Sequence, residues 1–218
     1  MKDQDIARVI ALIKGAVKTE RLPMIAAGRR TSPDPYRILI STLLSLRTKD
    51  EVTRRADERL FELASTPEEM VRLSEDVIRA AIYPVGFYRR KAQTIISVSR
   101  ELIDRFSSRV PSDIDELLSL KGVGRKTANL VVSMGYGRPA LCVDTHVHRV
   151  SNRLGYVAAA NPDATEAALR KKLPRRYWID FNGLIIAFGK SICRPVSPLC
   201  SSCPVRDYCD RVGVRISR

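Results

Sequence analysis

Four cysteines near the end of the chain have the residue type and the spacing of a metal centre. Cys193, Cys200, Cys203 and Cys209 follow the pattern Cys-x6-Cys-x2-Cys-x5-Cys. Thiolates are strong ligands for zinc and for iron–sulfur clusters. Structural zinc usually uses two close cysteine pairs, whereas only Cys200 and Cys203 form such a pair here. The unequal spacing therefore favours a larger iron–sulfur cubane, while zinc or reactive thiols stay open as alternatives.

A second candidate site lies in residues 117–132, LLSLKGVGRKTANLVV, where two apolar helices are expected to flank a Gly-x-Gly turn. Gly122 and Gly124 leave the amides of the turn unshielded at the start of the second helix, where backbone N–H groups can bind a phosphate. A helix–hairpin–helix grips the DNA backbone in this way without reading sequence. Lys121 and Arg125 flank the turn and add positive charge. We therefore predict that these four residues contact DNA.

Two further residues, Lys126 and Asp144, have side chains that could do covalent chemistry. Lys126 stands at the start of the helix after the turn, and a neutral lysine amine is a nucleophile. Asp144 follows in the segment VDTH. The residue types alone favour a plainer interpretation, in which Lys126 is another phosphate contact and Asp144 caps a helix. Both interpretations stay open at this point.

The charge of the chain favours a polyanionic partner. The 218 residues include 38 Lys and Arg against 24 Asp and Glu, which gives +14, and residues 165–218 alone hold 11 basic and 4 acidic side chains. Neutralising phosphates releases counterions, so such a field favours nucleic acid over the alternative of a merely solvated basic surface. The sequence has neither an apolar run long enough to cross a membrane nor a signal peptide. We therefore expect a cytoplasmic protein.

The elements that must position these side chains are expected to be helices. Apolar residues recur with helical spacing along the chain, and no hairpin or pair of alternating strands interrupts them. Residues 35–46 are apolar nearly all round, which predicts a central buried helix. The sequence therefore predicts an all-α fold. The expected helix starts are marked by Asp50, the capping box Thr66-Pro67-Glu68-Glu69, Ser74, Ser112 and Asn161.

Taken together, the motifs resemble those of the endonuclease III family of helix–hairpin–helix DNA glycosylases. LLSLKGVGRKTANLVV, VDTHVHRVSNRLG and the cysteine pattern stand in the family's order, and the resemblance covers about residues 35–209. It implies a base-excision-repair enzyme that removes oxidised pyrimidines from duplex DNA and cuts abasic sites. It also implies a [4Fe–4S] cluster on the four cysteines. The implied domains are a six-helix barrel, residues 27–138, and a discontinuous cluster domain, residues 1–26 and 139–218. We expect a monomer.

The resemblance also assigns roles to single residues. Lys126 matches the family's catalytic lysine, which displaces the base, forms a Schiff base with the sugar and leads to β-elimination. Asp144 matches the catalytic aspartate, which helps to activate the nucleophile and stabilises positive charge on the sugar. Arg47 stands where many members have a glutamine that fills the gap left by the flipped base, so the opposite-base preference is open. Arg194, between the first two cysteines, is implied as a contact to DNA.

Three alternatives remain beside this interpretation. An adenine-mismatch glycosylase lacks the lysine and uses a glutamate in the central helix, but residues 37–46 contain no acidic residue. A thymine-mismatch glycosylase typically has tyrosine at the position of Lys126. A non-catalytic DNA-binding protein with a structural metal needs neither Lys126 nor Asp144. The presence of both residues favours the bifunctional glycosylase and lyase.

Overall fold

The computed structural model describes residues 1–17 and 34–218. Every regular element in these two ranges is a helix, which confirms the predicted all-α class. The chain divides into a continuous unit, Gly28–Arg138, and a split unit, Met1–Ala27 with Pro139–Arg218. No helix in the described ranges has the length and apolar character that crossing a membrane requires.

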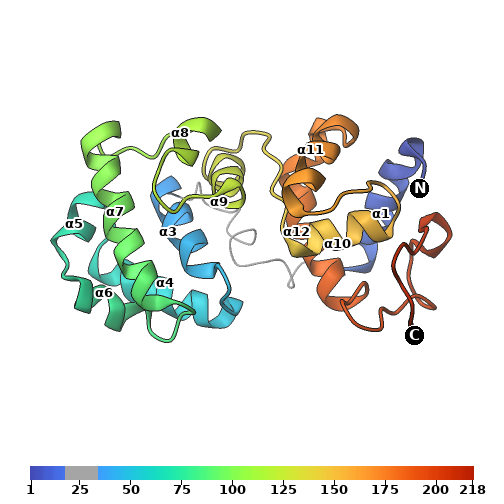
Figure 1. Ribbon diagram of the computed structural model, residues 1–218, viewed down its shortest axis with the longest axis horizontal. Helices are drawn as coiled ribbons and strands as arrows, with labels where there is room; N and C mark the ends of the chain where they lie inside the picture. Colours follow the sequence, from blue (N-terminus) through green and yellow to red (C-terminus); the bar gives the residue numbers. More distant parts are fainter. Residues whose placement is uncertain (18–33) are drawn as a thin grey trace. The chain divides into compact units, whose positions relative to one another are not determined.

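The continuous unit is built around one buried helix, α3. Eight of the eleven residues of α3 are buried, and it packs against α4, α7 and α9 (Figure 1). The predicted central helix is therefore confirmed. The elements of this unit are α3 (Pro35–Ser45), α4 (Asp50–Leu63), α5 (Pro67–Arg72), α6 (Glu75–Ile82), α7 (Tyr88–Phe106), α8 (Ile114–Leu118), α9 (Arg125–Leu130) and the π-helical turn η3 (Val131–Gly135).

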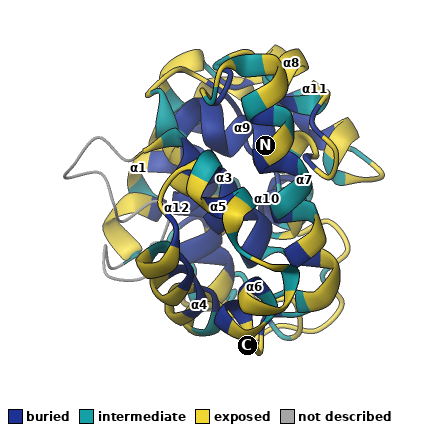
Figure 2. Ribbon diagram, turned by 90° about the vertical axis from the view of Figure 1, so that its left-hand side faces the viewer, coloured by how far each residue is buried: buried dark blue, intermediate teal, exposed yellow. Residues whose placement is uncertain are grey.

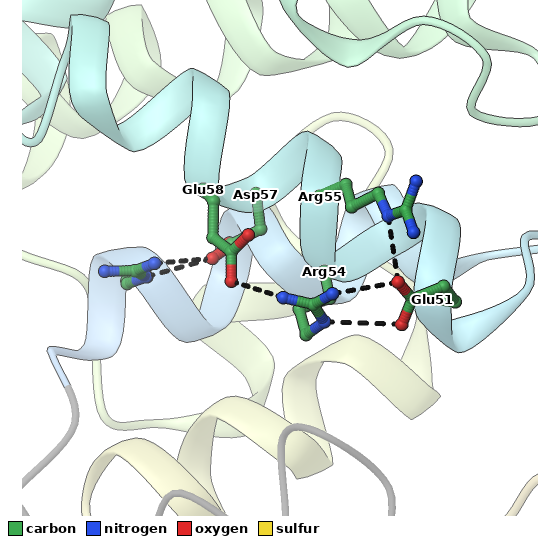
Figure 3. A network of polar contacts seen from close by, with 6 residues as sticks. Glu51, Arg54, Arg55, Asp57 and Glu58 are labelled. Carbon is green, nitrogen blue, oxygen red and sulfur yellow. Dashed lines mark hydrogen bonds and ion pairs between the residues drawn. The ribbon is translucent and has the colours of Figure 1, made fainter.

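An ion pair between a half-exposed arginine and a buried aspartate fixes α3 against α4. Arg37 Nη2 donates to Asp57 Oδ2 at 2.7 Å, and the Asp57 side chain is only 5% exposed. The Arg37 side chain is itself 48% exposed, so water screens the pair and it contributes less to stability than a fully buried pair would. The outer face of α4 carries exposed pairs at helical spacing, which water screens, so they contribute little to stability. Figure 3 shows this ladder, formed by Glu51, Arg54, Arg55 and Glu58.

The helix starts agree with the sequence signals at three of five places. The Thr66 capping box is present, and the side chains of Ser74 and Asn161 cap α6 and α11. The caps predicted at Asp50 and Ser112 are wrong, each by one residue. Lys49 precedes α4, so Asp50 already lies in the first turn, where its charge still complements the helix dipole. Asp113 caps α8 because its carboxylate accepts from two backbone N–H groups.

The split unit packs its helices around α12. This helix lies against α1 and α10, and Figure 2 shows it largely in the dark blue of buried residues. Cys193, Cys203 and Cys209, from the segment after α12, pack against the same apolar core. The elements are η1 (Asp3–Asp5), α1 (Ile6–Ala16), α10 (Thr145–Arg153), α11 (Pro162–Lys172), η4 (Arg175–Tyr177), α12 (Trp178–Ser191) and η5 (Arg206–Tyr208).

Candidate active site and metal centre

The glycine turn between α8 and α9 needs glycine at only one of its two positions. Gly122 has φ +89°, and a Cβ there would lie 2.6 Å from Cγ2 of Thr94 on α7. Gly124 has φ −101°, which any residue can adopt, and no described atom lies within 4 Å of its would-be Cβ. Gly122 therefore allows the turn to close against α7, whereas Gly124 leaves open space beside the start of α9.

This difference predicts different effects of the same substitution. We expect Gly122→Ala to lower the free energy of unfolding by about 1–3 kcal/mol, because alanine is strained at this φ and its methyl group meets Thr94. Gly124→Ala is the comparison variant and should cost less, because alanine there meets no atom and is not strained, although it caps α9 less well than glycine. Urea denaturation followed by circular dichroism measures both values. Equal destabilisation by the two variants would contradict the assignment.

Lys126 lies in the first turn of α9, on a helix held firmly in the continuous unit. The side chain is half-buried, while the next four residues of the helix, 127–130, are all buried. Figure 2 shows α9 in dark blue accordingly. Lys121 and Arg125 are exposed on either side of the turn. The hairpin thus presents two exposed cations and one half-buried lysine on a rigid base.

Asp144 caps helix α10 in the split unit. Its Oδ1 accepts from the backbone N–H of His146 at 2.8 Å and of Val147 at 2.9 Å. The plainer interpretation of Asp144 as a cap is therefore correct as a description of its contacts. The two hydrogen bonds fix the carboxylate relative to α10, and α10 is itself held in place because Val147 packs in the core. Lys126 and Asp144 belong to different units.

The remaining two candidate cations, Arg47 and Arg194, are both exposed. Arg47 follows α3 with φ 54°, and its guanidinium carbon lies 5.6 Å from the centre of the Phe87 ring. Phe87 is 63% exposed, and no sequence pattern pairs it with Arg47. Arg194 Nε donates to the carbonyl of Ser191, at the end of α12, so its side chain lies along that helix end.

The four predicted cysteine ligands line one cavity in the split unit. All four are partly buried free thiols. The cavity is otherwise mainly apolar, and it includes the cationic side chains of Arg153 and Arg211. Arg153 Nη1 lies 3.6 Å from Cys193 Sγ. An all-thiol donor set with nearby cations fits an iron–sulfur cluster, because the cations offset the negative charge that four thiolates bring.

The pKa values of two of these thiols are raised, which favours their protonated form. Burial, with a smaller contribution from the neighbouring cysteines, raises the pKa of Cys203 to about 11. The pKa of Cys209 is raised for the same reasons, and its Sγ donates to the carbonyl of Arg153 at 3.3 Å. Thiols in this state bind metal only by releasing protons, so the positive charge of a metal centre is required to stabilise the thiolates.

Comparisons with known proteins agree with this geometry. Residues 40–175 match the family described as HhH-GPD superfamily base excision DNA repair protein. Residues 193–209 match the iron–sulfur binding domain of endonuclease III, and they begin and end on the outer predicted ligands. The chain is 48% identical over 177 residues to endonuclease III of Thermotoga maritima, covering 81% of this chain and 83% of that protein.

Two solved structures are similar over nearly the whole chain. One is a trapped endonuclease III–DNA covalent intermediate, with a TM-score of 0.84, 33% identity and 97% coverage of both chains. The other is a thermostable thymine-DNA glycosylase, with a TM-score of 0.82, 25% identity and 94% coverage of both chains.

Proposed function

The chain belongs to the endonuclease III family of helix–hairpin–helix DNA repair proteins, and on this premise we propose how its residues carry out the reaction. It is a DNA glycosylase with abasic-site lyase activity, it binds DNA, and it carries a [4Fe–4S] cluster. The observation that carries this conclusion is the match, over 97% of both chains, to an endonuclease III covalently trapped on DNA. We propose oxidised pyrimidines as its substrates and the cytoplasm as its location, on the nucleoid if the organism is prokaryotic.

Lys126 is the proposed nucleophile. The damaged base is inaccessible inside the stack, so the nucleotide first flips out of the duplex. The neutral amine of Lys126 attacks C1′ of the sugar, the bond from C1′ to the base breaks, and the base leaves with the electron pair and takes up a proton. The nitrogen then gives up a proton, the bond from C1′ to O4′ breaks, and O4′ takes up a proton with the electron pair of that bond, which leaves a ring-opened sugar joined to Lys126 as a protonated Schiff base. Removal of a proton from C2′ then expels the 3′ phosphate, which cuts the strand on the 3′ side of the lesion.

Asp144 is the proposed electrostatic partner of this step. Its carboxylate stabilises the positive charge that develops on the sugar as the base leaves, and it helps to hold the proton that Lys126 releases. The cap on α10 supports this role, because two backbone hydrogen bonds fix Oδ1 and so limit the rotation of the group. A preorganised carboxylate needs little rearrangement when the charge appears.

The proposed DNA contacts are of two kinds, those that bind phosphates and one that enters the gap left by the flipped base. Gly122, Gly124, Lys121 and Arg125 bind phosphates through the hairpin amides and two flanking cations, and Arg194 adds a phosphate contact beside the cysteines. Arg47 fills the gap that the flipped base leaves. We assign the continuous unit as the helix–hairpin–helix domain and the split unit as the cluster domain.

The four cysteines hold the cluster, which links the segment after α12 into one cross-linked loop that supports DNA binding. We expect Cys200→Ala to lose most of its iron and its broad visible absorption, because the three remaining thiolates cannot replace the missing ligand. Without the cluster to hold this loop, the variant should bind duplex DNA about tenfold or more weakly. Cys142→Ala is the matched control, because Cys142 does not line the cavity, and it should keep the full iron content. Iron analysis and a filter-binding titration measure both effects. A wild-type protein with one zinc ion and no iron would refute the cluster.

The proposed activity is tested on duplexes that differ only in the lesion. The protein is incubated with duplexes that contain thymine glycol, an abasic site, a G·T mismatch or an A·G mismatch, with and without borohydride. We expect strand cleavage and a covalent adduct with the first two duplexes only. Excision of thymine or adenine from a mismatch without cleavage would instead support a monofunctional mismatch enzyme. Binding without reaction on any duplex would support the non-catalytic alternative.

A further inference from the structure

Lys91, on α7, is a buried lysine whose ammonium group is surrounded by backbone and hydroxyl oxygens. The residue is 8% exposed. Its Nζ donates to the carbonyl of Leu44 at 2.7 Å, to the carbonyl of Leu46 at 2.5 Å and to Oγ1 of Thr48 at 3.2 Å. An ammonium group has three N–H donors and no acceptor, so these three oxygens satisfy it completely. Buried lysines are rare unless they are paired in this way.

The acceptors of Lys91 lie at the C-terminal end of α3. The last carbonyls of a helix lack partners within the helix and carry partial negative charge, so a cation there is stabilised. Burial lowers the pKa of Lys91 to about 8, which still leaves the group mainly protonated at pH 7. The charged form is the one that can donate to all three oxygens.

The segment that Lys91 holds contains Arg47. We call residues 46–48 the Arg47 loop. Arg47 has φ 54°, a left-handed conformation that is strained for a non-glycine residue. Thr48 Oγ1, which accepts from Lys91, also accepts from the backbone N–H of Gly86 at 3.1 Å. A Cβ on Gly86 would lie only 2.6 Å from the carbonyl oxygen of Arg47. The strained loop is thus clamped between Lys91 and the chain at Gly86.

The clamp sets an exposed pair of side chains next to one another. Phe87 follows Gly86, is also left-handed with φ 58°, and is 63% exposed. The Arg47 guanidinium lies 5.6 Å from its ring, within the range of a cation–π contact. Strain at exposed residues persists only where the surroundings impose it. Here the hydrogen bonds from Lys91 and the close approach of Gly86 are what impose it.

We propose that Lys91 is a positioning residue for base excision, whose ammonium group holds the Arg47 loop in the conformation that presents Arg47 to the gap in the duplex. The inference rests on the proposed function, in which Arg47 fills the gap left by the flipped base. Lys91 acts through the loop, because two of its three donors bind Leu46 and Thr48 of that loop and the third binds the carbonyl of Leu44, two residues before it. Removing the Lys91 ammonium group should therefore impair the same step as removing the Arg47 side chain, which is the filling of the gap in the duplex.

The test is a double-mutant cycle of Lys91→Met and Arg47→Ala, measured as single-turnover excision of thymine glycol by the cluster-containing protein. Met keeps the apolar stem and removes the ammonium group. Misplacing a group that positions the substrate can cost about a hundredfold, so we expect each single variant to excise about 10–100-fold more slowly. The double variant should stay within about twofold of Arg47→Ala, because both changes remove the same contact.

A merely structural role of Lys91 gives a different result. The two effects would then multiply, and the double variant would be much slower than Arg47→Ala, which overturns the proposal. A wild-type rate for Arg47→Ala would overturn it as well. Thr48→Val removes one acceptor of Lys91 without burying a new charge, and it replaces Lys91→Met in the cycle if that variant does not fold. If the wild-type protein excises no lesion at all, the proposed function is wrong. If the wild-type protein is active but the effects of the two substitutions multiply, only the role proposed for Lys91 is wrong.

Discussion

We expect Lys126→Arg to abolish the borohydride-trapped adduct with an abasic-site duplex and to lower lesion excision by at least about a thousandfold. A guanidinium group stays protonated and cannot form a Schiff base, so the covalent route is closed. The same substitution keeps a cation in the first turn of α9. A contact to phosphate would therefore survive in this variant, and loss of reaction separates the nucleophile from the plainer phosphate-binding interpretation.

The matched control for this experiment is Lys121→Arg, on the other side of the glycine turn. Lys121 is exposed and is proposed to contact phosphate only, so arginine should preserve both the adduct and the rate. The adduct is measured by gel mobility after reduction, and the excision rate by single turnover. If Lys126→Arg forms as much adduct as wild type, another amine is the nucleophile and the assignment of Lys126 is wrong.

Local sequence signals predicted most of the helices, and they singled out as candidate ligands the four cysteines that line one cavity. The apolar run at residues 35–46 forms α3, which is buried except near Arg37 and its ends because its other side chains are apolar or small. The Thr66 capping box is local as well, since its partners lie within four residues. The four cysteines stand out because four thiols in such close spacing are typical of a metal site.

Sequence reasoning failed where distant contacts decide the structure. A lysine in an amphipathic helix is normally exposed, so nothing marked Lys91 as buried. Its acceptors come from the end of another helix, and their positions follow from packing. The pairing of Arg47 with Phe87 depends in the same way on two left-handed residues that no motif announces. The residues that tune a site are therefore harder to predict than those that carry its chemistry.

Asp144 is the residue for which structure and resemblance suggest different roles, and one substitution separates them. Asparagine is as good a helix cap as aspartate, so Asp144→Asn should keep the hydrogen bonds from the N–H groups of His146 and Val147. The charge is lost. We expect melting temperature, iron content and DNA affinity close to wild type, while the single-turnover excision rate falls by about 10²–10⁴-fold.

Two comparisons make this result decisive. Asp144→Ala removes the cap as well as the charge, and it should lose about 1 kcal/mol of stability in addition to the rate. Asp113→Asn makes the same exchange at the cap of α8, where the carboxylate also accepts from two backbone N–H groups, and it should leave stability and rate unchanged. A wild-type rate for Asp144→Asn would reduce Asp144 to a cap. The positive charge on the sugar would then have to be stabilised by another group.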